Sequence, residues 1–327
     1  MSAHNGQRLR IAILGAGAMG SFFGGSLAEG GSDVTLIDVN APHVEAIRQH
    51  GLALSTDSGK RHIHLNALFP PEAKGTFDLV IVFTKAMHTT AALSAVRSCI
   101  GPDTVLLSLQ NGLDNKLALS GFAPAENILV GVTTYPADLV GPGQVESHGN
   151  GVARIAAIAK GTPPILPMLP DLFGRGGLNA LVDPHAETAI WEKVAFNAAL
   201  NTLCAITRST VGQIGADPET RNLAFTIAGE VCNTAVACGF PVNAANVETT
   251  LASAMQHHTH HKPSMLQDVL AGRPTEIESI CGAVVRHAKT RSMPVPMNET
   301  VLTLIRHIDL KTGSEGRVNS MGSAQSA

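Results

Sequence analysis

One segment of the chain, Ile190–Ala205, combines polar and apolar residues in a pattern that could do chemistry. The spacing of four predicts that Lys193, Asn197 and Asn201 share one stripe of a helix, because residues four apart lie on the same face, and most other residues of the segment are apolar. A buried polar group without a partner costs about 1–3 kcal/mol, and a charge costs more. The stripe therefore indicates a wall that faces a polar ligand, although a buried hydrogen-bond network or a narrow solvated face would give the same pattern.

A second group of residues has the GxGxxG spacing of a dinucleotide-binding turn. It follows an expected strand, Ile11–Leu14, and opens an expected helix within a βαβ unit of about thirty residues, which is the context that the motif requires. The first glycine permits a tight turn, the second lets the backbone approach a pyrophosphate, and free amides at the helix N-terminus meet the phosphate charge. The predicted cofactor-binding residues of this turn are Gly15, Ala16, Gly17, Ala18, Met19 and Gly20. The alternative is a glycine-rich turn on a similar fold that has lost its cofactor.

An acidic residue, Asp38, ends the next expected strand, Asp33–Ile37. Its carboxylate can accept hydrogen bonds from both hydroxyls of an adenosine ribose, whereas it would repel a 2′-phosphate. No arginine or lysine follows before Arg48. The sequence therefore favours NAD(H) over NADP(H), although Asp38 could also be a residue that merely initiates a turn.

Composition excludes several classes of function. The 327 residues suffice for two domains, and a formal net charge of −3 gives no basic surface for nucleic acid or an anionic membrane. We expect no secretory signal, and five cysteines without CxxC spacing are typical of reduced thiols in a cytoplasmic protein. The cluster His257, His258, His260 and His261 has no cysteine or carboxylate close by at ligand spacing. It indicates a polar loop rather than a metal site, so we expect no metal.

The elements that must position these residues divide the chain into two halves. The first half alternates strand-like and helix-like segments, which predicts a mainly parallel sheet with helices on both faces. Its strands are expected at Leu9–Leu14, Asp33–Ile37, Phe77–Phe83, Thr104–Leu109, Ile128–Thr134 and Val152–Ile158. From about residue 186 the spacings of three and four predict helices only, at Leu223–Cys238, Val242–Gln256, Ser264–Leu270, Ile277–Lys289 and Glu299–Ile308.

These patterns predict the α/β class, with an N-terminal Rossmann-type, doubly wound, mainly parallel sheet and an all-helical C-terminal domain. We expect the dinucleotide-binding domain at residues 8–185 and a helical domain for substrate binding and dimerisation at 186–312, with Asp183-Pro184-His185 breaking the pattern near the boundary. The tail, 313–327, lacks apolar anchors and is predicted to be disordered.

Five motifs together resemble the ketopantoate reductase (2-dehydropantoate 2-reductase) family, over about residues 10–308. They are GAGAMG near the N-terminus, Lys85 after FDLVIVF, Gln110-Asn111-Gly112 after TVLLSL, WEKVAFNAALN, and SMLQDVLAGRPTEIE. The resemblance implies that Lys193 is the general acid and that Asn197 and Asn201 contact the substrate. It further implies that Ser264 holds the substrate carboxylate, that Glu276 acts beside the reacting centre, and that Lys85 and Asn111 line the nicotinamide side.

The resemblance thus gives three sets of site residues. Lys193 and Glu276 are the predicted catalytic residues, and Asn111, Asn197, Asn201 and Ser264 are the predicted substrate-binding residues. Predicted cofactor contacts outside the glycine-rich turn are Asp38, Lys85, Asn111 and Glu276.

Several of these residues have simpler interpretations. Glu276 follows Pro274 at the expected start of a helix, where any acidic residue is favoured. Ser264 could cap the following helix, Asn111 before Gly112 could form only a turn, and Lys85 could be a solvated residue at a strand end.

The predicted function is NAD(P)H-dependent reduction of a 2-oxo acid to a 2-hydroxy acid, with 2-dehydropantoate the first substrate to test. Two departures from the family pattern bear on it. Asp38-Val39 stands where many members carry a basic residue for the NADP phosphate, and HHKPS and ESICG replace segments in which the family often has asparagine. An NAD-dependent D-2-hydroxy acid dehydrogenase acting on another branched or aromatic acid is the alternative enzyme, and a cofactor-binding redox sensor is the alternative outside enzymes. The sequence leaves open which 2-oxo acid is used and whether the protein forms a homodimer.

Overall fold

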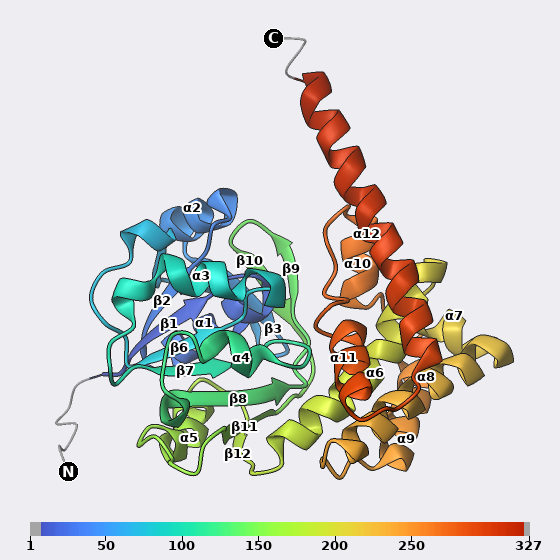
Figure 1. Cartoon of the computed structure of the whole chain (residues 1–327). Coiled ribbons are helices and arrows are strands. Elements are labelled where there is room, and N and C mark those ends of the chain that lie inside the picture. Colours follow the sequence, from blue (N-terminus) through green and yellow to red (C-terminus); the bar gives the residue numbers. More distant parts are fainter. Residues whose placement is uncertain (1–7, 324–327) are drawn as a thin grey trace. The chain divides into compact units, whose positions relative to one another are not determined.

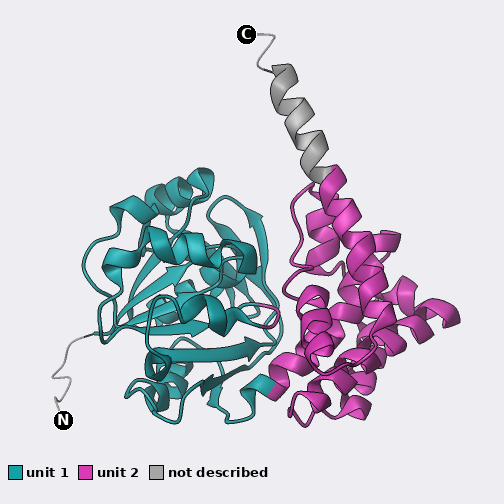
Figure 2. Ribbon diagram, viewed as in Figure 1, with its two compact units in different colours: residues 1–110, 114–187 teal, residues 111–113, 188–327 magenta. Residues whose placement is uncertain are grey.

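A computed structural model describes residues 8–323 of the chain. These residues form two compact units, coloured separately in Figure 2. The first unit contains the chain up to Gln110 together with Asp114–Glu187, and the second contains Asn111–Leu113 and the chain from Thr188 onward. The short segment Asn111–Leu113 thus belongs to the helical unit, although both of its neighbours along the chain belong to the first.

The first unit is built on an eight-stranded sheet with the order β12-β11-β8-β7-β6-β1-β2-β5 (Figure 1). All neighbouring strands are parallel except β8 and β11, which run antiparallel. The strands are β1 Arg10–Leu14, β2 Asp33–Ile37, β5 Asn66–Leu68, β6 Leu79–Val82, β7 Val105–Ser108, β8 Ile128–Thr133, β11 Ala153–Ala157 and β12 Ala180–Val182. The predicted fold class, with its mainly parallel sheet, is confirmed.

Alternation along the central strand β1 places apolar side chains on both faces of this sheet. Ile11 and Ile13 join a core that includes residues of α1 and α5, whereas Ala12 and Leu14 join a second core with residues of α3 and α4. Strands covered on both faces are continuous apolar runs, because every side chain is buried. The helices of this unit are α1 Ala18–Glu29, α2 Ala41–His50, α3 Thr89–Ala95, α4 Asn115–Leu119 and α5 Leu169–Arg175.

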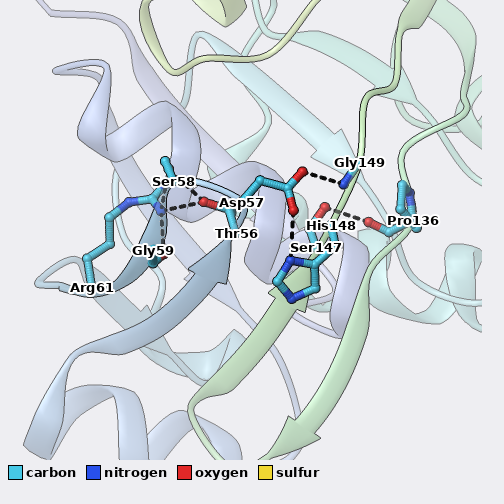
Figure 3. Close-up of polar contacts among 9 residues, drawn as sticks. All are labelled: Thr56, Asp57, Ser58, Gly59, Arg61, Pro136, Ser147, His148 and Gly149. Carbon is cyan, nitrogen blue, oxygen red and sulfur yellow. Dashed lines mark hydrogen bonds and ion pairs between the residues drawn. The ribbon is translucent and has the colours of Figure 1, made fainter.

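A second, smaller sheet of four strands was not predicted. Its order is β4-β3-β10-β9, and its strands are β3 Leu52–Thr56, β4 Gly59–Ile63, β9 Asp138–Gly141 and β10 Gln144–Ser147. Figure 3 shows how polar contacts fix one end of this sheet: Asp57, in the β3–β4 turn, accepts hydrogen bonds from the Gly149 amide (2.7 Å) and from Nδ1 of His148 (3.0 Å). These two donors hold the pKa of the Asp57 carboxyl below its usual range.

The second unit consists of helices around one apolar core, together with the segment Asn111–Leu113. Helix α6 (Ala186–Thr207) contributes fully buried residues such as Ala195 and Leu200, and Trp191 packs against Phe240 and His287. The remaining helices are α7 Val211–Ala216, α8 Pro218–Ala237, α9 Ala244–His257, α10 Ser264–Leu270, α11 Cys281–Thr290 and α12 Pro296–Ser323. None of the described helices is long and apolar enough to cross a membrane.

The end of the chain bears on one further prediction. Helix α12 includes residues 313–323 of the segment for which we predicted disorder, and the remaining four residues, 324–327, lie outside the described residues. The disorder of this segment stays a prediction.

Candidate functional site

The glycine-rich turn (residues 15–20) connects β1 to α1. Gly15 has φ +96°, and a Cβ there would lie 2.6 Å from the backbone nitrogen of Thr84. A Cβ on Gly20 would lie 1.9 Å from the carbonyl oxygen of Gly15, so only glycine lets the helix approach the strand this closely. A Cβ on Gly17 would meet nothing within 4 Å. Packing inside the unit therefore requires Gly15 and Gly20, whereas Gly17 leaves open space beside the helix N-terminus, which fits the approach of a pyrophosphate.

Asp38 follows β2 and faces the same turn. Its Oδ2 accepts a hydrogen bond from the Ala16 amide (2.6 Å), and its Oδ1 accepts one from the Asn40 amide (2.8 Å). A carboxylate can accept about four hydrogen bonds, so these two amides orient Asp38 and leave acceptor positions for the hydroxyls of a ribose. The same bonds also stabilise the local turn, so both interpretations of Asp38 agree with this geometry. Val39, beside it, is 80% exposed.

Lys85 lies three residues after Val82, the last residue of β6, on the carboxyl side of the parallel strands, and is partly buried. The backbone that carries it is held by Gln110, which follows β7. The side-chain nitrogen Nε2 of Gln110 donates to the carbonyl of Thr84 (2.6 Å) and to Oγ1 of Thr89 (2.7 Å). Gln110 is 7% exposed, and a buried side chain with these bonds fixes the two strand ends to each other. The resemblance listed Gln110 only as part of a motif and gave it no role.

Lys193 lies on α6 in the second unit and is partly buried. Desolvation lowers the pKa of its ammonium to about 8, while the negative charge of Glu276 acts in the opposite direction. The other members of the predicted stripe, Asn197 and Asn201, are only 6% and 5% exposed. The stripe is therefore enclosed rather than solvated along most of its length, which argues against the narrow wet face.

Glu276 lies in a turn, residues 275–280, and not at the start of a helix. We predicted a helix over Ile277–Lys289, but α11 begins only at Cys281. One local bond and one tertiary contact hold this turn: Oγ of Ser279 donates to the Glu276 carbonyl (3.0 Å), and Asp309 of α12 accepts from the amide and from Oγ1 of Thr275. A helix dipole therefore does not account for an acid at position 276, which is partly buried.

The segment Asn111–Leu113 is tied to this same turn. The Leu113 amide donates to the carbonyl of Ser279 (2.8 Å), and a Cβ on Gly112 would lie 2.5 Å from that oxygen. Gly112 has φ +89°, so glycine is required there both by its conformation and by this contact. The helical unit thus brings Lys193, Glu276 and the Asn111 segment together, although they come from three distant parts of the sequence.

Ser264 and the histidine cluster lie elsewhere on the second unit. Ser264 is the first residue of α10 and is exposed, and the capping position is taken by Pro263 without a side-chain cap bond. The loop after α9 is tied to α7 through backbone bonds from Val211 to His261 and from Gly212 to Thr259. Among the described residues, no group of three or more His, Cys, Asp and Glu side chains could hold a metal ion.

Comparison with known proteins matches both units. The model of the family described as "Ketopantoate reductase PanE/ApbA" matches residues 11–160, and that of its C-terminal domain matches residues 185–309. A 2-dehydropantoate 2-reductase of Streptococcus pyogenes serotype M6 is 31% identical over 296 residues, which cover 90% of this chain and 96% of that protein.

Two solved structures extend the comparison to three dimensions. D-mandelate dehydrogenase in complex with NADH and anilino(oxo)acetate is 32% identical, with a TM-score of 0.89, and the match covers 93% of this chain and all of that one. A 2-dehydropantoate 2-reductase from Geobacter metallireducens is 30% identical, with a TM-score of 0.86, covering 91% of this chain and 99% of the other.

Proposed function

The chain belongs to the ketopantoate reductase family and is an NAD(P)-dependent oxidoreductase that acts on a CH–OH group; from this premise we propose that it reduces a 2-oxo acid with Lys193 as the general acid. One observation carries the proposal: the pKa of Lys193 is lowered to about 8 on a helix that also buries Asn197 and Asn201. A proton donor is most effective when its pKa lies near the working pH. Lys193 then remains protonated at neutral pH and still transfers its proton readily.

The proposed reaction places charge where these side chains can neutralise it. The nicotinamide, when bound, supplies the hydride that reduces the carbonyl carbon. Negative charge develops on the carbonyl oxygen, and Nζ of Lys193 donates the proton that completes the hydroxyl. A positioned general acid of this kind contributes about 10²–10⁴-fold to the rate. The carboxylate of Glu276 raises the pKa of Lys193, so it keeps the ammonium charged in an environment that otherwise disfavours the charge.

The remaining residues hold the two reactants in this proposal. The glycine-rich turn and Asp38 bind the dinucleotide, and Lys85, Asn111 and Glu276 contact its nicotinamide end. The amides of Asn197 and Asn201 orient the 2-oxo acid, and the exposed hydroxyl of Ser264 binds its carboxylate. Asp38 and the exposed Val39 support a preference for NADH, because no basic side chain stands there to hold a 2′-phosphate. A cytoplasmic location and a homodimer stay predictions from the sequence.

The first substrate to test is 2-dehydropantoate, since that is the acid named for the curated relatives. A second candidate is an aromatic 2-oxo acid, because the D-mandelate dehydrogenase structure matches this chain with a TM-score of 0.89 and carries NADH. Both candidates use the same lysine and the same coenzyme site, so they differ only in the group attached to the oxo acid.

A panel of 2-oxo acids, each assayed with NADH and with NADPH, tests the proposal. It should include 2-dehydropantoate, the aromatic acid phenylglyoxylate and simple branched acids, with kcat/KM as the measurement. We expect the highest value for 2-dehydropantoate with NADH. A higher value for phenylglyoxylate would support the second candidate, and no reduction of any acid with either coenzyme would contradict the proposed function.

A further inference from the structure

His43 on α2 is buried beside the glycine-rich turn, although most of its helix is exposed. Only 1% of its surface is accessible. The amide of Gly143, in the β9–β10 turn, donates to Nδ1 of His43 at 2.9 Å, and Nε2 lies 2.9 Å from Oγ of Ser21 on α1. Three elements of the first unit therefore meet at this ring, and none of its nitrogen atoms faces solvent.

The contacts fix the direction of each hydrogen bond. A backbone N–H can only donate, so Nδ1 is an acceptor and the single ring proton of a neutral histidine is on Nε2. Nε2 then donates to Oγ of Ser21, and this hydroxyl donates to the carbonyl of Ala16 at 2.8 Å. Gly143 is itself anchored to the small sheet, because its carbonyl accepts a hydrogen bond from the Ala53 amide (2.8 Å).

The chain of bonds ends at Asp38. Ala16 is held on both sides: its carbonyl accepts from Ser21, and its amide donates to Oδ2 of Asp38 at 2.6 Å. The Ala16 carbonyl belongs to the peptide that leads into Gly17, the residue with open space beside the helix N-terminus. A shift of this residue would therefore move both the carboxylate that faces the ribose and the backbone that faces the pyrophosphate.

We propose that His43 and Ser21 are positioning residues for the coenzyme: their hydrogen bonds hold Ala16 and thereby orient Asp38 for an unphosphorylated ribose. This inference rests on the proposed function for its ligand, an NAD(H)-type dinucleotide. The small sheet contributes to this positioning as well, because the Gly143 amide in its β9–β10 turn holds the Nδ1 atom of His43. If Asp38 is less firmly oriented, it binds a ribose diol less well and repels a 2′-phosphate less strongly. The hydrogen bonds from His43 to Asp38 therefore affect coenzyme selectivity as well as affinity.

The charge state of the ring agrees with this arrangement. Burial lowers the pKa of His43 from its usual value, and the negative charge of Asp38 and the nearby Ala16 carbonyl act more weakly in the opposite direction. The neutral ring that the Gly143 contact requires is thus the form that burial favours.

Three variants of the full-length protein test the individual hydrogen bonds between His43, Ser21 and Ala16. Ser21→Ala removes the middle link, and His43→Asn keeps a polar group near the position of Nδ1 but none near Nε2. His43→Gln instead places an amide near Nε2, so it can restore the bond to Ser21. Ser26→Ala is the matched control, because Ser26 is another buried serine of α1, 2% exposed.

The dissociation constants of NADH and NADPH are measured by calorimetry without any oxo acid, together with the melting temperature. We expect Ser21→Ala and His43→Asn to weaken NADH binding about tenfold, which corresponds to about 1.4 kcal/mol, and to weaken NADPH binding less. His43→Gln should retain the affinity of the parent within about threefold, and Ser26→Ala should leave both constants unchanged.

Two results would overturn the proposal. One is parental affinity for NADH in both Ser21→Ala and His43→Asn. The other is an equal loss for NADH and NADPH that His43→Gln shares, since that would indicate general damage to the fold. Failure of the proposed function is distinguishable, because it appears as a parent protein that binds NADH but reduces no 2-oxo acid.

Discussion

The glycine-rich turn of the first unit and the Lys193 stripe of the second hold their charged groups in different ways. Asp38 is oriented by two backbone amides, those of Ala16 and Asn40, and it lies at a strand end. Lys193 is instead a partly buried side chain, and desolvation lowers its pKa to about 8. The backbone amides of the first site fix the position of the bound coenzyme, whereas the burial of Lys193 in the second site sets the pH range in which it can donate a proton. We therefore expect substitutions in the first unit to change coenzyme affinity, and substitutions in the second to change turnover.

The largest expected effect tests the second half of this comparison. Lys193→Ala should lower kcat by about 100-fold or more, because the proton donor is lost, and should leave the dissociation constant of NADH nearly unchanged. Lys289→Ala is the matched control, since Lys289 is an exposed lysine of α11 in the same unit. Turnover of Lys193→Ala within about threefold of the parent would remove Lys193 from the role of general acid.

The next effect concerns pH and sharpens the role of Glu276. The pKa of Lys193 is lowered from its usual value, so its acid form is present below about pH 8 and is lost as the pH rises through that value. The rate of reduction should therefore fall above about pH 8. Glu276 raises the pKa of Lys193, so Glu276→Gln should shift this fall to lower pH.

Glu276→Gln and Ser264→Ala should also lower kcat/KM for the oxo acid, by about tenfold, with unchanged dinucleotide affinity. The measurements are pH–rate profiles of kcat and the dissociation constant of NADH for each variant and the parent. A profile that does not move in Glu276→Gln would show that this carboxylate does not act on Lys193. Weaker NADH binding with normal use of the oxo acid would show that these residues serve coenzyme binding and not use of the oxo acid.

Two glycines of the glycine-rich turn, Gly17 and Gly20, provide an internal control for the first unit. Gly17→Ala adds a Cβ that meets nothing within 4 Å, whereas Gly20→Ala places one 1.9 Å from the Gly15 carbonyl oxygen. Gly17→Ala should leave the melting temperature unchanged and weaken NADH binding about tenfold, because the added methyl occupies space meant for the pyrophosphate. Gly20→Ala should lower the melting temperature. If Gly17→Ala instead binds NADH as the parent does, the pyrophosphate does not approach this residue.

The sequence predicted the parts of the first unit that are contiguous motifs and missed those that depend on tertiary contacts. The glycine-rich turn is contiguous, and the strands beside it are apolar runs; for Asp33–Ile37 the predicted and observed bounds agree. The small sheet was missed because its strand β4, Gly59–Ile63, has only one buried residue and therefore no apolar run. His43 was missed because its helix is mainly exposed, and only the Gly143 and Ser21 contacts distinguish it from a surface histidine.

The helical unit was harder to predict from spacing alone. The Lys193 stripe was visible as a pattern, but Glu276 and Asn111 entered only through the resemblance to a family. Their connection depends on tertiary contacts, namely the Leu113–Ser279 hydrogen bond and the Thr275–Asp309 pair. Asp309 stands 34 residues after Thr275, and no local pattern signals such a pair. Residues 277–280, which precede α11, were therefore wrongly predicted as helix.

The smallest expected effect is on the choice between NADH and NADPH. The parent should favour NADH in kcat/KM, because the carboxylate of Asp38 accepts from a ribose diol and repels a 2′-phosphate. Asp38→Ala should reduce that ratio by about tenfold, which is about 1.4 kcal/mol. Val39 is 80% exposed, so an arginine at this position can reach a phosphate without disturbing the core, and Asp38→Ala combined with Val39→Arg should reverse the ratio. Val39→Arg alone is the control. The retained Asp38 carboxylate can pair with the new guanidinium, so this variant should change the ratio less than the double variant. A parent that favours NADPH by about tenfold or more would contradict this role of Asp38. In that case its bonds to Ala16 and Asn40 would serve only the turn, and selectivity in the first unit would arise from other residues.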